Sequence, residues 1–190
     1  VVEPQYGQVP PDRPQPDLNK VREAAQRISE ARRPVIVAGA GVKYSGAYEA
    51  LNHLAEAMHV PVATSLNAKD AILDNNPLSV GVVGTYSRRS ANQVVAEADL
   101  VIFVGTRAGG MTTHFWTIPA KGTSTIQIDI DPLVNGRNYP TDVSIVGDAR
   151  VTLEKMNELN MPVPKERVEW LKQVKKICTS YTIDFKDVYK

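Results

Sequence analysis

Cysteine is almost absent from this sequence, which has one, Cys178, among 190 residues. One cysteine excludes a framework of internal disulfides and fits a reducing compartment, so we expect a cytoplasmic protein. An excess of charge is also absent, because the formal net charge is +1 at pH 7. This balance gives no bulk electrostatic reason to expect nucleic acid or an anionic membrane as a partner. No apolar run approaches the roughly 20 residues that a membrane-spanning helix needs.

The short patterns of common catalytic centres are missing as well. The sequence has no Gly-x-Ser-x-Gly elbow, no phosphate-binding Gly-x-x-x-x-Gly-Lys loop and no pair of glutamates on one helix face. Its three histidines, His53, His59 and His114, show neither metal-ligand spacing nor a pairing with Cys178. We therefore predict that this chain has no catalytic residue and no metal ligand.

The sequence does have a regular alternation of apolar runs and helical patterns. Its hydrophobic fraction of 43% is enough to build a core. We predict strands from short apolar runs at residues 35–38, 60–64, 99–105, 125–129 and 143–146. Because parallel strands need a crossover connection, usually a helix, the alternation predicts an α/β fold. We expect a doubly wound, mainly parallel, Rossmann-like sheet of five to six strands with helices on both faces, and a loop over residues 77–87.

Two helices are predicted near the ends of the chain. Asp17 is expected to cap a first helix that carries Val21, Ala25 and Ile28 on one face and that Pro34 stops. A last helix is expected to turn one apolar stripe inward. This stripe consists of Val168, Leu171, Val174 and Ile177.

The segments outside these elements are polar or rich in proline. Residues 1–16 hold five prolines, so we expect an extended linker there. Basic residues gather around the last helix, and we expect them to form a solvated helix face rather than a nucleic-acid patch. They are Lys165, Arg167, Lys172, Lys175 and Lys176.

The strand at residues 35–38 leads directly into a glycine turn. Gly39 and Gly41 follow it, and a helical pattern comes next. Strand, glycine turn and helix open a nucleotide-binding domain, because glycine lets a ligand approach backbone N–H groups near a helix N-terminus. Tyr44 stands where the full dinucleotide fingerprint has its third glycine. The turn therefore fits either a nucleotide site or a plain tight turn.

Charged residues follow three of the predicted strands. Arg107 could form two parallel hydrogen bonds to a phosphate, or it could pair with Asp129 or Asp131. Asp129 could accept hydrogen bonds from a ribose hydroxyl, or it could serve the turn at Asp131-Pro132. Asp148 is expected to cap the next helix rather than to meet a ligand.

Five short motifs fall in one order along residues 17–160. They are RPVIVAGAG at 33–41, VPVATSLNAK at 60–69, the segment from GVVGT at 81–85 to ADLVIFVGTR at 98–107, QIDIDP at 127–132 and VSIVGDA at 143–149. Together they resemble the central domain of thiamine-diphosphate-dependent enzymes of the acetolactate synthase and pyruvate oxidase group.

This resemblance implies a domain that is not itself the catalytic centre. In that family, thiamine diphosphate and Mg²⁺ are held by an N-terminal and a C-terminal domain, whose glutamate and Gly-Asp-Gly…Asn-Asn motifs this chain lacks. It therefore implies a central domain, excised from a homo-oligomeric transferase or lyase that acts on 2-oxo acids. The expected boundaries are a linker at 1–16, the domain at 17–160, and a helix and linker toward a missing domain at 161–190.

Some members of the family bind FAD or ADP in the loops after the strands. By position, the contacts would be Gly39, Gly41, Leu66, Asn67, Gly84, Thr85, Arg107, Asp129 and Asp148. The sequence departs from the flavin-binding pattern at Ala68 and Asp70, where glycines are common, and again at residues 108–111. Asp70 in particular would add a negative charge near a phosphate.

Two alternatives from other classes remain open. A self-contained NAD- or nucleotide-binding oxidoreductase domain would need the third glycine and a hydride-transfer partner. A ligand-free interaction domain would predict that Arg107 pairs with an acid instead of facing an open cleft.

Overall fold

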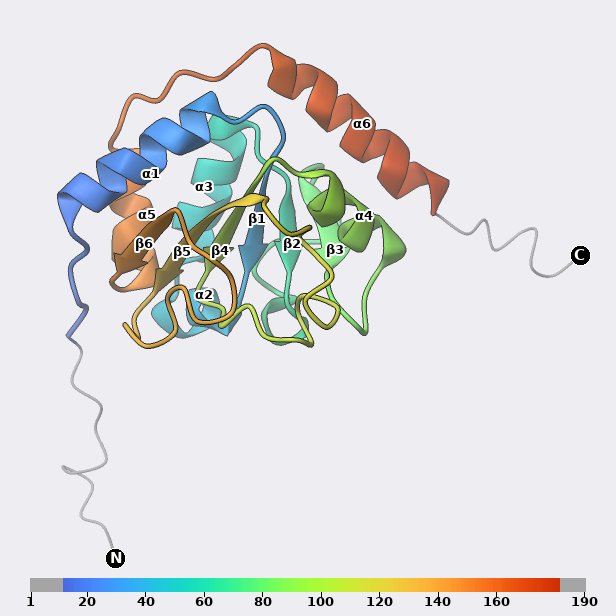
Figure 1. Ribbon diagram of the computed structural model, residues 1–190. Helices are drawn as coiled ribbons and strands as arrows, with labels where there is room; N and C mark the ends of the chain where they lie inside the picture. Colours follow the sequence, from blue (N-terminus) through green and yellow to red (C-terminus); the bar gives the residue numbers. More distant parts are fainter. Residues whose placement is uncertain (1–11, 182–190) are drawn as a thin grey trace, which may run out of the picture.

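The computed structural model describes residues 12–181, so predictions for residues 1–11 and 182–190 lie outside the described part. Its centre is one sheet of six parallel strands in the order β3-β2-β1-β4-β5-β6 (Figure 1). The strands are β1 (Pro34–Ala38), β2 (Val62–Thr64), β3 (Ser79–Val82), β4 (Leu100–Val104), β5 (Ser124–Asp129) and β6 (Val143–Val146). The prediction of a doubly wound α/β fold with a parallel sheet is confirmed.

Helices cover both faces of this sheet. They are α1 (Leu18–Glu30), α2 (Ala40–Ser45), α3 (Tyr48–Met58), α4 (Arg89–Glu97), α5 (Ala149–Asn157) and α6 (Glu166–Ser180), with the short 3-10 helix η2 (Leu66–Ala68) after β2. Asp17 caps α1 as predicted, its carboxylate accepting from the N–H of Asn19 at 2.8 Å. None of the described helices has the length and apolar character to span a membrane.

The two faces hold separate hydrophobic cores, because side chains alternate along each strand. On one face, Ile36 and Ala38 pack with apolar residues of α1, α2, α3 and α5. On the other, Val35 and Val37 pack with residues of α4 and α6. All five residues of β1 and of β4 are buried. This explains why these central strands read as continuous apolar runs in the sequence.

Strand β3 corrects the prediction of a loop over residues 77–87. It lies at the edge of the sheet and pairs only with β2, with a register shift between Val62 and Ala63. Gly81 within it has φ +90°. A short edge strand that contains such a glycine has little of the apolar periodicity from which strands are predicted.

Helix α6 corrects two further predictions. Val168 is 49% exposed, whereas Trp170, Val174 and Ile177 are buried against the sheet. Arg167, expected on a solvated face, is fully buried. The predicted stripe is therefore confirmed at Val174 and Ile177 and wrong at its start, where Trp170 and not Val168 is buried.

The buried guanidinium of Arg167 bonds to the ends of two other helices. It donates to the carbonyl oxygens of Ile28 and Ala31 at the end of α1 and of Met58 at the end of α3. The last carbonyls of a helix have no partner within the helix, and a cation is favourable beside them. Burial lowers the pKa of Arg167 to about 10. Arg167 thus ties the start of α6 to the edge where the strands begin.

Candidate functional site

The carboxyl ends of the six parallel strands lie at one edge of the sheet, the lower edge in Figure 1. Backbone hydrogen bonds join the loops that follow neighbouring strands. Gly39 donates to Val104, Ser65 to Ala38 and Gly147 to Asp129. Ligands of open α/β sheets bind beyond this edge, which we call the carboxyl edge. Every predicted site residue lies within three residues after the end of one of these strands, except Asp129, which ends β5.

The glycine turn after β1 is filled by the protein itself. The N–H groups of Gly39 and Gly41 donate to the carbonyls of Val104 and Gly105, at 2.8 and 2.9 Å. A Cβ on Gly41 would lie 2.6 Å from the Cα of Gly105, and one on Gly39 would overlap Gly105 and Thr106. These glycines allow two backbone segments to approach closely. Their N–H groups are already bonded, so they do not form a cradle for a diphosphate.

The loop after β2 exposes both apolar and polar side chains. Leu66 is 58% exposed, and Asn67 is exposed beside it. Asp70 pairs with Lys43 at 3.5 Å and accepts from the hydroxyl of Tyr48 at 3.1 Å. A backbone N–H, the Tyr48 hydroxyl and the charge of Lys43 lower the pKa of Asp70. The negative charge that would oppose a phosphate is therefore balanced by Lys43.

The turn after β3 is held by the amide of Asn92 on α4. This side chain accepts from the N–H of Gly84 at 2.8 Å and donates to its carbonyl at 3.0 Å. Gly84 has φ +110°, and a Cβ there would overlap the carbonyl oxygen of Met111. The N–H of Thr85 donates to that same oxygen, while the Thr85 hydroxyl oxygen is buried without a partner. Gly84 and Thr85 thus hold the loop after β4 in place.

Arg107 lies after β4, and Asp129 ends the neighbouring strand β5. Arg107 is exposed, and no ion pair within 4.0 Å joins it to an acid of residues 12–181. Asp129 is partly buried, and this desolvation raises its pKa, although the N–H of Asp131 and the charge of Arg107 act in the other direction. Asp129 also accepts from the N–H of Asp131 at 3.0 Å, as the turn interpretation predicts.

Asp148 is occupied by structural bonds. It caps α5 by accepting from the N–H of Val151 at 3.1 Å, so the predicted cap is confirmed. Arg13 donates to the same carboxylate and to the carbonyl of Ser45, at 3.1 and 2.8 Å. Sequence reasoning missed Arg13, because nothing in a proline-rich segment indicates which carboxylate it will reach.

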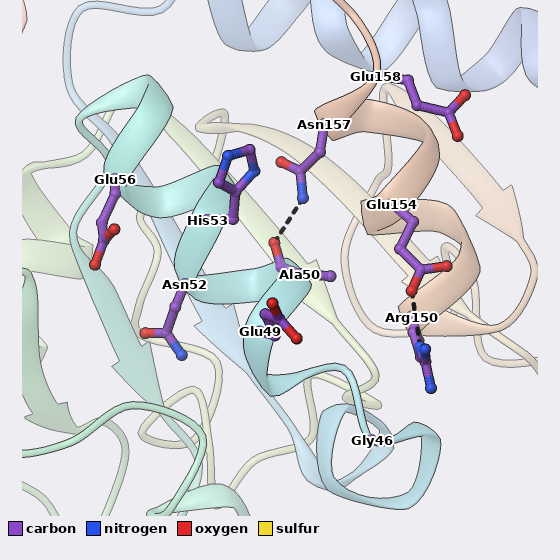
Figure 2. Close-up of a pocket in the computed structure, with 10 residues that line it drawn as sticks. All are labelled: Gly46, Glu49, Ala50, Asn52, His53, Glu56, Arg150, Glu154, Asn157 and Glu158. Carbon is purple, nitrogen blue, oxygen red and sulfur yellow. Dashed lines mark hydrogen bonds and ion pairs between the residues drawn. The ribbon is translucent and has the colours of Figure 1, made fainter.

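A separate cavity of about 760 Å³ lies on a helical face, between α3 and α5. Figure 2 shows that Asn157 of α5 reaches across to the carbonyl of Ala50, while Arg150 bonds to Glu154 on its own helix. The rest of its lining includes three further acids, Glu49, Glu56 and Glu158. Yet no group of three or more His, Cys, Asp or Glu side chains in the described chain is placed to hold a metal ion. This cavity lacks the convergent chemistry of a site.

Comparison with known proteins identifies the fold. A family model described as the central domain of thiamine pyrophosphate enzymes matches residues 21–156. The chain belongs to this central-domain family. The match begins within α1 and ends within α5, so it includes the whole sheet and every predicted site residue.

Relatives of this central domain are named as acetolactate synthases. The chain is 38% identical over 151 residues to a probable acetolactate synthase large subunit of Methanococcus aeolicus, covering 79% of the chain and 25% of that protein. It is 37% identical over 156 residues to the corresponding protein of Methanocaldococcus jannaschii, covering 82% and 26%. An acetolactate synthase of Mycobacterium bovis is 32% identical over 174 residues, covering 90% and 28%. The chain spans about a quarter of the length of these relatives.

Proposed function

We propose that this chain is the central domain of a longer, homo-oligomeric enzyme that uses thiamine diphosphate and Mg²⁺ to act on 2-oxo acids, as acetolactate synthase does. Its similarity to proteins of that name, over most of its own length but about a quarter of theirs, supports this proposal. In the proposal, an N-terminal and a C-terminal domain of the same polypeptide hold the two cofactors in a cytoplasmic enzyme. We assign this chain no step in the reaction, because its family match is to the central domain.

The role that we propose for the domain itself is structural. The observation that carries it is the filled glycine turn, where Gly39 and Gly41 bond to the loop after β4 instead of opening toward a ligand. These bonds tie the loops after β1 and β4 together at the carboxyl edge. The domain then acts as a scaffold to which the catalytic domains attach.

Two proteins test this proposal. The first is the isolated 190-residue chain, which we expect to form no acetolactate from pyruvate in the presence of thiamine diphosphate and Mg²⁺. The second is a chimera in which residues 12–181 replace the matched segment of the Methanococcus aeolicus protein, which we expect to form acetolactate. Turnover by the isolated chain, or a folded chimera without turnover, would contradict the proposal.

A second candidate function is the binding of FAD or ADP at the carboxyl edge. The exposed Arg107, with no ion pair to a described acid, favours it over the ligand-free alternative, which predicts such a pair. Arg107 would hold the diphosphate and Asp129 a ribose hydroxyl, while Leu66, Asn67 and Thr85 would line the site. Because the glycine turn does not fit a diphosphate, Gly39 and Gly41 would contribute shape only.

Calorimetric titration with FAD, ADP and NAD⁺ tests this second function. We expect binding of FAD or ADP that Arg107→Ala weakens by about 1.5–3 kcal/mol, the range for a charged hydrogen bond. Lys121→Ala is the matched control, because Lys121 is also exposed but lies in the loop that enters β5. Equal affinity in the two variants, or binding of NAD⁺ alone, would contradict this assignment.

A further inference from the structure

A cavity of about 1030 Å³ lies beside β3, between the start of α4 and the C-terminal half of α6. Its lining comes from residues 74–77 before β3, the first half of β3, residues 88–90 and residues 174–181. We call it the α4–α6 groove. Its volume suits a small organic molecule rather than a single ion. None of the residues that line it is among the contacts predicted at the carboxyl edge.

Three cations and one acid line this groove. Arg88 forms an ion pair with the acid, Asp74, at 3.0 Å. Arg89 and Lys175 are exposed, and neither has an ion pair with an acid of residues 12–181. One begins α4 and the other belongs to α6, so uncompensated positive charge lies on both sides of the groove.

Arg88 is held in place along its whole length. Its backbone N–H donates to the carbonyl of Val82 at 2.9 Å, and its stem lies against Gly81, where a Cβ would approach the Cδ of Arg88 to 2.6 Å. The guanidinium donates to Asp74 and has further N–H groups to offer. Because the side chain is already ordered, these groups can bind the oxygens of a phosphate with little further loss of entropy.

The floor of the groove is apolar, and its two helical walls are tied together. Val80 and Val174 are buried at its base, with the half-buried Cys178 beside them. The hydroxyl of Tyr181 at the end of α6 donates to the amide oxygen of Gln93 on α4, at 2.9 Å. An apolar floor with a few placed polar groups is the usual lining of a small-molecule site.

From these observations we propose that the α4–α6 groove binds an organic phosphate. The phosphate would lie among Arg88, Arg89 and Lys175, and the apolar body of the ligand over Val80 and Val174. A phosphate monoester has a charge of about −1.5 to −2 at pH 7, so it can compensate both unpaired cations. Free inorganic phosphate has the same anionic chemistry, and the experiment distinguishes the two. This site does not depend on the proposed function, because this chain supplies every residue in it.

Calorimetric titration of the 190-residue chain with phenyl phosphate tests the proposal, with inorganic phosphate and phenol as comparisons. We expect phenyl phosphate to bind at least about tenfold more tightly than either, since only it gains both the charge pairing and the burial of a ring. Arg89→Ala and Lys175→Ala should each weaken its binding by about tenfold or more, the lower end for a charged hydrogen bond.

The matched controls are Arg32→Ala and Lys176→Ala. Both residues are exposed cations without an ion pair to a described acid, and neither lines the groove. An equal loss of affinity in the control variants, or no binding of phenyl phosphate, would overturn the site. Equal affinity for phenyl phosphate and inorganic phosphate would overturn the organic ligand and leave an inorganic anion only.

NMR chemical shifts of the backbone amides locate the bound phenyl phosphate. We expect shifts at residues 88–90 and 174–181 and none at residues 39–41 and 105–107 of the carboxyl edge. The opposite pattern would overturn the α4–α6 groove and support a ligand site at the carboxyl edge instead.

Discussion

Arg167 carries a charge, yet its guanidinium is fully buried among three carbonyl groups. Arg167→Met should leave those acceptors without a donor. Each unsatisfied buried group costs roughly 1–3 kcal/mol, so the free energy of unfolding should fall by about 3 kcal/mol or more in urea denaturation. The control is Lys172→Met on the same helix, whose ion pair with Glu169 is exposed. A similar loss in both variants would contradict the role given to Arg167.

Gly84 lies at a position that has no room for a side chain. Gly84→Ala would place a methyl group against the carbonyl of Met111 at φ +110°. We expect a loss of at least about 2 kcal/mol in the free energy of unfolding, from strain and displacement together. Gly109→Ala is the matched control, because nothing lies within 4 Å of a Cβ there. The explanation fails if the two substitutions have equal effects.

Asp129 should make stability depend on pH. Desolvation raises its pKa in the folded state above the ordinary value of 3.8. The folded protein then holds this proton more tightly than the unfolded chain, so the contribution to stability is present at low pH and is lost as the pH rises through the folded pKa. Asp129→Asn should therefore be more stable than the parent at pH 7, with the difference disappearing toward about pH 3.

Asp142 supplies the opposite case in the same titration. The hydroxyl of Ser124 and the N–H of Thr125 lower its pKa. Its contribution is present above the unfolded pKa and lost as the pH falls, so Asp142→Asn should be less stable than the parent at pH 7 and equal to it in acid. Chemical denaturation at several pH values measures both variants. If Asp129→Asn were also less stable at pH 7, the cause given for its pKa would be wrong.

Single residues were predictable where their role is local. Asp17 and Asp148 were predicted as caps because a cap needs only the helix that follows it. Arg167 and Asn92 act across the fold, on groups far away in the sequence or on the neighbouring turn. No spacing in the sequence indicates such partners, and this is why the charged set around α6 was interpreted as solvated. The cofactor contacts predicted at the carboxyl edge stay predictions.

At the scale of elements, α6 is an integral part of the fold even though the family match ends at residue 156. Trp170 is 2% exposed, and its indole N–H donates to the carbonyl of Pro34 at 3.0 Å. Trp170→Ala should cost about 3–5 kcal/mol, the range for removing a large buried side chain. Trp116→Ala, which removes an exposed indole, should change the free energy of unfolding by less than about 0.5 kcal/mol. Urea denaturation compares them, and a loss in Trp170→Ala as small as that expected for Trp116→Ala would show that α6 is not needed for stability.

Elements were predictable in proportion to their burial. The central strands β1 and β4, buried on both faces, read as unbroken apolar runs and were found near their predicted bounds. The edge strand β3 was missed because it pairs with one neighbour only and contains a glycine, so it has little of the apolar pattern from which strands are predicted. The stripe of α6 was predicted correctly at Val174 and Ile177 but not at its start, where Trp170 and not Val168 is buried.

At the scale of the whole molecule, the alternation of strands and helices predicted the architecture but not the strand order. The order places β1 beside both β2 and β4, so the glycine turn after β1 meets the loop after β4. Because β1 and β4 are neighbours, the N–H groups of the turn donate to backbone carbonyls at the end of β4 and just after it. This contact depends on topology, and a pattern of residues along one chain does not determine it.

The long sequence separation between Arg167 and its acceptors also has a consequence for folding during synthesis on the ribosome. Its three acceptors precede it by 139, 136 and 109 residues. At about 5–20 residues per second, the first helix is made several seconds before the guanidinium that completes it. The bonds of Arg167 to the ends of α1 and α3 can therefore form only after α6 has left the exit tunnel.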